Sequence, residues 1–285
     1  MTLVALALVL TAAVLHATWN LLAKRARGGV LFVWLFSLLS VVVFAPFAAY
    51  LIWTGSGFDA TGLIYVAGSA IIHLAYFLTL QYGYRAGDLS VVYPLARGSG
   101  PLLSTAGAIA WFGERPSWLA LGGALLVVIG VFLIAGGGAI MSRRFLSRGV
   151  AFGLSTGVLI AAYTLWDKQA VSAAMVPPLL LDFGSSVGRV VLLTPVLWPQ
   201  RVGLRHEWRT HGREALGVAI LSSLAYILVL TAFVTTPVSY VAPAREISIL
   251  IGALMGAKLL REGSVGRRLV AATMMACGVM ALALG

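Results

Sequence analysis

SVVYPLARGSGPLLSTAGAIAWFGE, residues 90–114, is apolar almost throughout, yet it carries Arg97 near its middle and has no acidic residue before Glu114. The stretch is long enough to cross about 30 Å of hydrocarbon as an α-helix. Arg97 would then lie roughly eight residues, or about 12 Å, into the span, at a cost of about 2.5–3.5 kcal/mol for inserting the charge. We therefore expect a membrane helix whose arginine faces a charged partner or a water-filled cavity.

Apolar runs of similar length recur along nearly the whole chain. Of its 285 residues, 60% are hydrophobic and only 10% are charged, against roughly 25% charged in a soluble domain. The first run has no basic segment before it and no small-residue cleavage site after it, so we expect a retained helix. The pattern predicts an all-α membrane protein with ten transmembrane helices, near residues 3–23, 30–53, 61–84, 89–112, 117–136, 146–167, 177–198, 212–234, 238–260 and 266–284.

The net charge of +11 follows from membrane topology and not from a nucleic-acid-binding surface. Lys and Arg lie in short loops, with no continuous patch, zinc knuckle or aromatic–basic platform, so we expect no nucleic acid partner. Arg115 and Lys168 lie on one side of the membrane and three arginines lie inside apolar runs, which leaves fifteen of the 20 on the other side. The positive-inside rule then predicts a multi-pass protein of the cell inner membrane, with cytoplasmic basic loops and both termini outside.

Several motifs occur twice, in the same order. LAYFLTL at 74–80 returns as LAYILVL at 224–230, SVVYPLAR at 90–97 returns as SYVAPAR at 239–245, and VLHATWNLLAKRA at 14–26 matches VLIAAYTLWDKQA at 158–170. Because five spans per copy is an odd number, the second copy begins on the opposite side of the membrane. We predict two inverted five-helix repeats, residues 1–140 and 141–285, which is the architecture of many secondary transporters.

With its Pro- and Arg-containing fourth helices, which close on the Glu-bearing turns WFGERPS and LLREGSV, the chain resembles the EamA family of the drug/metabolite transporter superfamily. The resemblance covers essentially the full chain and implies a ten-helix transporter without an ATPase domain. It also implies a carrier that often exports amino acids or other small metabolites. The second copy lacks the Tyr and Leu of YPLAR, so the two halves of a central site cannot be chemically identical.

Arginines within the membrane are the first candidates for substrate contact. Arg97, its repeat mate Arg245 and Arg189 in the seventh span lie deep, and only Glu246 and Asp182 are expected to be deep enough to pair with them. Three cations against two acids leave a positive cavity, which favours a solute with a carboxylate or phosphate-like group. The alternatives are a structural pair, Arg97 with Glu246 or Arg245 with Asp182, and snorkelling to the interface. Because neighbouring residues point to different helix faces, we expect Arg245 and Glu246 to have separate partners.

Two prolines mark expected kinks in the fourth and ninth spans. Pro94 and Pro243 each remove a hydrogen bond to the carbonyl four residues earlier, on Ser90 and Ser239. A freed carbonyl at membrane depth is tolerated where it lines a cavity or is covered by neighbours. Each kink is therefore either a packing bend or a gating hinge.

Histidines and aromatic residues complete the candidate site. His16 and Asn20 share one face of the first span, and His73 lies one turn from Tyr76 in the third. Either histidine could couple protons to transport or could simply be buried and hydrogen-bonded. The aromatic candidates for the substrate wall are Tyr76, Tyr93, Tyr226 and Trp19, the last of which could instead join the interfacial belt.

Other motifs have structural interpretations. Glu114 and Glu262 follow the fourth helix of each repeat and are expected to cap a helix start or pair with an arginine. Glycine pairs four residues apart fit close helix packing: Gly149-Gly153-Gly157, Gly184-Gly188 and Gly252-Gly256.

Competing functions have little support in the sequence. Gly153–Gly157 matches a G-x-S-x-G nucleophile pattern but lies in an apolar run, whereas that motif needs a strand–turn–helix elbow. Zinc, P-loop and dinucleotide motifs are absent, so we expect neither an enzyme nor a metal or cofactor, and the short loops offer no signalling or scaffold domain. We predict a carrier that acts as a monomer and exports an amino acid or related metabolite, with protons as a candidate coupling ion. The alternative is uptake of an anionic metabolite such as a carboxylate, phosphonate or sugar phosphate.

Overall fold

The computed structural model describes the chain except residues 27–28, 87–88, 135–147 and 261–264, together with some side chains next to these segments. Within the described residues the protein is helical, without strands. Helices satisfy the backbone hydrogen bonds within each segment, which is what a lipid environment requires. The helices are α1 (Leu3–Ala26), α2 (Val30–Trp53), α3 (Ala60–Ala86), α4 (Leu89–Phe112), α5 (Trp118–Ile134), α6 (Arg148–Ser172), α7 (Pro178–Leu197), the short η1 (Trp198–Gln200), α8 (Arg201–Thr235), α9 (Val238–Arg245), α10 (Ile247–Leu260) and α11 (Val265–Leu284).

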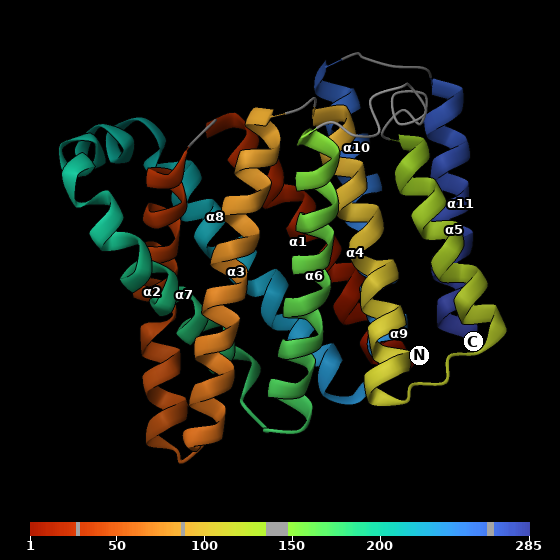
Figure 1. Cartoon of the computed structure of the whole chain (residues 1–285), viewed down its shortest axis with the longest axis horizontal. Helices are drawn as coiled ribbons and strands as arrows, with labels where there is room; N and C mark the ends of the chain where they lie inside the picture. The colour runs from red at the N-terminus through yellow and green to blue at the C-terminus, as the bar shows by residue number, and fades with distance from the viewer. Residues whose placement is uncertain (27–28, 87–88, 135–147, 261–264) are drawn as a thin grey trace.

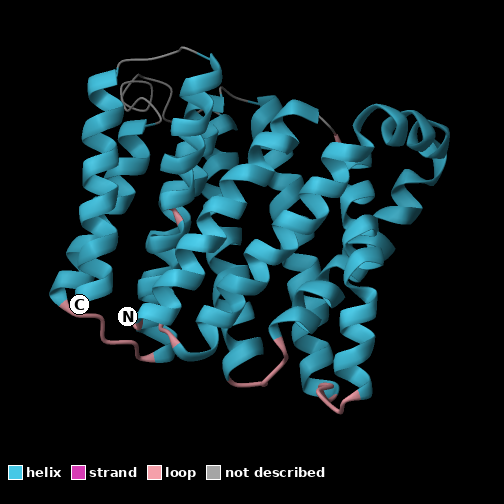
Figure 2. Cartoon of the chain, turned by 180° about the vertical axis from the view of Figure 1, so that it is seen from behind, coloured by secondary structure: helices cyan, strands magenta, loops and turns pink. Residues whose placement is uncertain are grey.

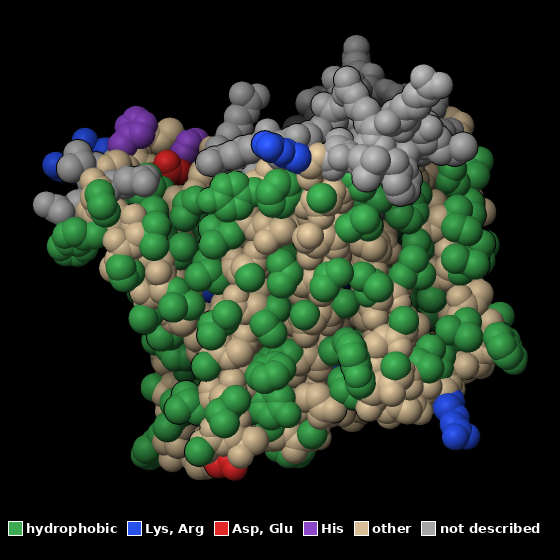
Figure 3. Space-filling model, in the orientation of Figure 1, with side chains coloured by type: hydrophobic (Ala, Val, Ile, Leu, Met, Phe, Trp, Pro, Cys, Tyr) green, Lys and Arg blue, Asp and Glu red, His purple; other side chains and the backbone are tan. Residues whose placement is uncertain are grey.

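A helix lies at each of the ten apolar runs, and six of the helices are long and apolar enough, in their described residues, to cross a membrane. Shorter apolar helices lie at Trp118–Leu133 and Leu269–Leu284. Hydrophobic side chains cover most of the middle of the face shown in Figure 3, and most of its charged side chains lie toward the top and bottom ends. The protein is therefore a multi-pass membrane protein.

Most helices begin and end within a few residues of the expected boundaries, and α6 continues five residues beyond its expected end, to Ser172. Two differences are larger. α8 begins at Arg201, earlier than the expected 212, because a polar and basic segment continues the helix beyond the apolar run. The ninth run is divided into α9 and α10 at Glu246. There the Glu246 amide donates to the Pro243 carbonyl at 3.0 Å, and the Glu246 carbonyl accepts from the Ile249 amide at 2.9 Å.

The sequence predicts a kink at Pro243, and the break between α9 and α10 lies three residues further along the chain. Pro243 and Ser239 are both buried inside α9. α4, in contrast, is helical from Leu89 through Phe112, although the side chains of Ser90 and Pro94 lie outside the described residues. The two fourth helices of the sequence repeat are thus built differently.

Glycines allow the predicted close packing of α6 on α4 and of α7 on α3. A Cβ added to Gly157 would lie 1.9 Å from the Ser99 Oγ, and one added to Gly188 would lie 2.5 Å from the Ala70 Cβ. Gly252 differs, because a Cβ there would meet Ala17 only at an ordinary 3.9 Å. The GLSTG sequence lies inside α6, so it does not form a nucleophile elbow.

Contacts between helices join the two halves of the chain throughout (Figures 1 and 2). α5 packs on α11, and α2 packs on α7. Four further contacts form two corresponding pairs: α3 on α6 with α1 on α8, and α2 on α8 with α3 on α7. The two termini lie at the same end of the molecule, where the Met1 ammonium donates to the Ala283 carbonyl at 3.3 Å (Figure 1).

Glu114 has the structural role predicted for it. Its carboxylate accepts the Val238 and Ser239 amides at 2.7 and 2.9 Å, and so caps the first turn of α9. These amides have no partner within their own helix, and a negative charge at a helix N-terminus is stabilising. Glu262 lies outside the described residues.

Candidate functional site: a charged cavity between the two halves

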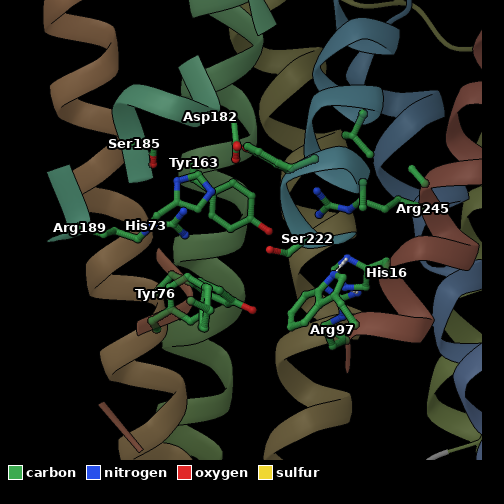
Figure 4. Close-up of a pocket in the computed structure, with 17 residues that line it drawn as sticks. His16, His73, Tyr76, Arg97, Tyr163, Asp182, Ser185, Arg189, Ser222 and Arg245 are labelled. Carbon is green, nitrogen blue, oxygen red and sulfur yellow. Dashed lines mark hydrogen bonds between the residues drawn. The ribbon is translucent and has the colours of Figure 1, made fainter. Parts of the chain in front are cut away.

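A cavity lies at the centre of the helix bundle and is lined by four helices from each half of the sequence, α1–α4 and α6–α9. Its volume, counted as the space that the centre of a water molecule can occupy, is about 90 Å³. Its lining combines small, aromatic and charged side chains: Ala12, His16, Trp19, Phe36, His73, Tyr76, Phe77, Arg97, Tyr163, Asp182, Ser185, Arg189, Ser222, Ala225, Tyr226, Val229 and Arg245. Figure 4 shows two ends, with Arg97, His16 and Arg245 at one and Asp182, Arg189 and His73 at the other.

Most of the predicted site residues lie in this lining, namely His16, Trp19, His73, Tyr76, Arg97, Tyr226 and Arg245. Trp19 faces the cavity and so does not belong to an interfacial belt. Asn20 lies outside the lining, where its amide donates to the His16 carbonyl at 2.8 Å. The side chain of Tyr93 lies outside the described residues. Glu246 is fully buried behind the arginines, where it contributes charge and no cavity surface.

Glu246 lies between the two arginines of the repeated motif. Its Oε2 is 3.1 Å from the Arg97 Nε, and its Oε1 is 3.6 Å from the Arg245 Nε. The predicted pairing of Arg97 with Glu246 is thus confirmed, whereas the expectation that Arg245 and Glu246 point apart is wrong. That expectation assumed a continuous helix, whereas the helix is interrupted at Glu246 between α9 and α10. The two arginines and one carboxylate give this end of the cavity one excess positive charge.

His16 links this arginine cluster to Trp19. The Arg97 Nη2 lies 3.3 Å from the His16 Nε2, and the Trp19 indole donates to the His16 Nδ1 at 3.3 Å. A neutral imidazole has one acceptor nitrogen, and an imidazolium has none. A donor faces each of the two ring nitrogens, so after protonation to the imidazolium neither nitrogen could accept from the donor that faces it. The geometry favours a neutral His16 and does not support the proton-coupling role considered for it.

At the other end of the cavity, Asp182 and Arg189 project from α7. Both side chains are buried and line the cavity. The Arg189 Nη2 donates to the Ser186 Oγ at 2.7 Å, and its guanidinium lies 5.7 Å from the centre of the Phe77 ring. Asp182 therefore offers a carboxylate to the cavity, as its depth in the sequence predicts.

A third acid, Asp167, lies behind this end and was missed in the sequence analysis. It is fully buried, its Oδ2 accepts a hydrogen bond from the Tyr226 hydroxyl, and the same oxygen lies 3.9 Å from the His73 Nδ1. The sequence places Asp167 at the end of an apolar run, but α6 continues to Ser172 and brings it inside the bundle. The neighbouring Lys168 donates to the carbonyls of Phe233 and Thr236, at the end of α8, and so does not neutralise the cavity.

Asp167 changes the charge balance inferred from the sequence. Among the described residues the buried Arg, Asp and Glu side chains are three arginines and three acids, Asp167, Asp182 and Glu246, so their charges balance when all are ionised. The side chains that line the cavity directly remain three arginines and one acid, Asp182. The buried charges are separated. Among the described residues, Arg97, Arg245 and Glu246 leave one excess positive charge at one end. Asp182, Arg189 and Asp167, which lies beside His73, leave one excess negative charge at the other.

Tyr163 is a further lining residue that sequence analysis did not single out. Its ring stacks on His73 at a centroid distance of 4.3 Å and lies 5.9 Å from the Arg245 guanidinium. The aligned repeats carry the signal, because VLHATWN and VLIAAYT place Tyr163 opposite Trp19. Among the described residues, no group of three His, Cys, Asp or Glu side chains could hold a metal ion.

The fold and the cavity define a multi-pass helical membrane protein with a polar chamber inside it. The family model of the EamA-like transporter family matches residues 3–136, which confirms the resemblance found in the sequence. The match covers a little under half of the chain. The family is part of the drug/metabolite transporter superfamily, and the match suggests a membrane transporter of small solutes.

Solved structures share the fold. One, described as "Crystal structure of protein", superposes with a TM-score of 0.75 at 17% identity and covers 98% of this chain and 96% of its own. At this identity the similarity establishes the architecture alone. No curated relative matches the chain.

Proposed function

We propose that the protein is a secondary transporter whose solute is a small zwitterion, most simply an amino acid. The observation that carries the proposal is the separation of charge across the cavity. The carboxylate of an amino acid would lie at the Arg97 and Arg245 end, and its ammonium group at the Asp182 end. Guanidinium groups bind carboxylates through paired hydrogen bonds, which gives the orientation.

The size of the cavity restricts the solute. One water needs about 10–15 Å³ in the same measure, so a volume of about 90 Å³ corresponds to roughly six to nine water-sized positions. A small amino acid has a similar number of heavy atoms. The aromatic rings of Trp19, Tyr76 and Tyr163 and the side chain of Val229 supply apolar surface for a short aliphatic side chain.

The transport mechanism in this proposal is alternating access between two inverted five-helix repeats, residues 1–140 and 141–285. The paired contacts support it. Exchanging α1 with α6, α2 with α7, α3 with α8 and α5 with α11 maps each of these paired contacts onto another of them or onto itself. Substrate sites of such carriers lie between the repeats. Family resemblance favours export, and the charge of the loops favours an inner-membrane location with both termini outside.

Uptake of an anionic metabolite is the second candidate. One observation favours it, because the side chains that line the cavity directly include three arginines and a single carboxylate, Asp182. In that arrangement Asp167 and Glu246 would serve only to make burial of the arginines tolerable.

A matched set of solutes tests the proposal. Liposomes that contain the purified protein are loaded with valine. The outside medium then holds one labelled solute: valine, 3-methylbutanoate (which lacks the amino group) or isobutylamine (which lacks the carboxylate). We expect exchange of valine at least about tenfold faster than of either single-charge analogue, since each lost charge-assisted hydrogen bond costs about 1.5–3 kcal/mol.

Other outcomes decide between the alternatives. Faster exchange of 3-methylbutanoate or of a sugar phosphate than of valine would support the anion carrier. Chemical conversion of the solute would contradict transport altogether.

A further inference from the structure

Asp167 is a buried acid whose surroundings are unlike those of the other two. Glu246 lies within 3.6 Å of two arginines, and Asp182 borders the cavity. Asp167 is fully buried, and among the described residues the His73 Nδ1 lies 3.9 Å from its Oδ2. Its Oδ1 is buried and has no hydrogen-bond partner in the described part of the chain. An ionised carboxylate in such a place is costly, and a protonated one is much less so.

His73 connects this acid to the cavity. Its Nδ1 lies 2.9 Å from the Ser69 carbonyl, so this nitrogen must carry the hydrogen. The other ring nitrogen, Nε2, is then an acceptor, and the ring borders the cavity while its Nδ1 lies 3.9 Å from the Asp167 Oδ2. Two tyrosine rings pack against His73. Tyr163 stacks on it, and the centroid of the Tyr226 ring lies 5.3 Å from that of His73.

We infer that Asp167 is the binding site for a coupling proton, with His73 as the neighbouring titratable ring on the cavity side. The inference rests on the proposed transport of a zwitterion. Ionised Asp167 gives its end of the cavity the excess negative charge that attracts an ammonium group, and protonated Asp167 removes that excess. Proton and solute therefore weaken each other's binding, as reciprocal coupling between two sites requires. One proton entering would replace one solute leaving, and the neutral zwitterion carries no net charge of its own.

The surroundings of Asp167 are consistent with this role. The titratable and charged groups around it are His73 from α3, Tyr163 and Lys168 from α6, Asp182 and Arg189 from α7, Tyr226 from α8 and Arg245 from α9. Lys168 is directed at the end of α8, and Arg245 lies with Glu246 at the opposite end. Of these groups, Tyr226 donates to Asp167 and stabilises its ionised form. The buried Oδ1 without a partner among the described residues favours the protonated form.

The test measures proton and solute movement together in liposomes that hold valine and a pH-sensitive dye, with an acidic outside medium. The wild-type protein should release valine faster than it does without the gradient, and the interior should acidify in proportion to the valine released. Asp167→Asn should lower the number of protons per valine at least tenfold, and its valine exchange should no longer depend on pH.

Two comparison variants separate coupling from binding and from general damage. Asp182→Asn removes the acid that borders the cavity, and it should weaken valine binding while the valine that still moves keeps its proton. Glu207→Gln makes the same carboxylate-to-amide change in the basic first part of α8, away from the cavity, and should leave the ratio unchanged.

The outcomes that overturn the inference are distinct from failure of the proposed function. Wild-type protein that moves valine without protons, or Asp167→Asn protein that moves both in the wild-type ratio, would overturn it while leaving transport intact. If no zwitterion moves at all, the proposed function fails and the inference fails with it. Should Asp167→Asn not fold, Asp167→Glu retains a titratable group one methylene further out. Its coupling should have a shifted pH midpoint, and an unchanged pH profile would count against Asp167 as the proton site.

Discussion

Removing the charge of Glu246 is the sharpest perturbation that the structure offers. Glu246→Gln keeps the size and shape of the side chain but leaves Arg97 and Arg245 buried, 6% and 4% exposed, without the carboxylate that lies 3.1 and 3.6 Å from them. Removing one partner of a buried ion pair costs about 3–5 kcal/mol, because the remaining charge stays desolvated. Here two like charges remain, so the upper part of that range applies.

Thermal unfolding of the detergent-solubilised protein measures the effect. By the scaling for chains of about 150–250 residues, which this 285-residue chain slightly exceeds, 1 kcal/mol corresponds to roughly 2–4 °C. A loss of about 4–5 kcal/mol for Glu246→Gln should therefore lower Tm by about 8–20 °C. Arg97→Gln is the matched control, because it removes one cation and leaves Arg245 still paired with Glu246. Its Tm should fall less.

The double variant completes the cycle. With Arg97 also replaced, Glu246→Gln leaves one uncompensated arginine and not two, so the double variant should lose less than the sum of the single losses, by about 0.5–3 kcal/mol. A Tm for Glu246→Gln within about 2 °C of wild type, or strict additivity, would refute the ionic cluster.

Three further predictions concern capping, packing and binding. Glu114→Ala removes the acceptor for two amides at the start of α9 and should cost about 0.5–2 kcal/mol, measured as a fall in Tm; an unchanged Tm would show that the cap contributes nothing. Gly157→Ala should cost about 1–3 kcal/mol, because its Cβ would lie 1.9 Å from another side chain, whereas Gly122→Ala, with open space around it, should be neutral or stabilising; equal effects would argue against close packing of α4 on α6. Asp182→Asn should weaken valine binding at least tenfold and 3-methylbutanoate binding much less, as measured by ligand-induced shifts in Tm, and equal losses would argue against an ammonium site.

The energetic cost of burying charge explains why part of the site could be predicted from sequence. Arg97 and Arg245 are conspicuous in apolar runs, and a buried arginine needs an acid or water, so pairing of Arg97 with Glu246 was one of the predicted alternatives and is the one that the structure shows. Asp167 could not be found in this way. Its place next to Lys168 looks like the end of a span, and only the course of α6 beyond it shows that the acid is inside.

Local backbone geometry limited the remaining expectations. Pro243 predicts a bend, but where the chain bends depends on tertiary contacts, and these allow α9 to end at Glu246 rather than at the proline. The shift by three residues is enough to reverse the predicted relation of Arg245 to Glu246, because side-chain directions inferred from neighbouring positions hold only within a continuous helix.

The cap on α9 has a consequence for which parts of the protein can shift as rigid bodies. Glu114 belongs to the first half of the sequence and α9 to the second, and α9 also packs on α4 and α5 while α5 packs on α11. If rocking exposes the cavity to alternate sides, the contacts of α9 with α4 and α5 hold helices of both repeats together at this end, so we expect the boundary of motion to differ from the boundary of the duplication. Spin labels on residues 116 and 236 should keep a constant separation while labels across the cavity change theirs.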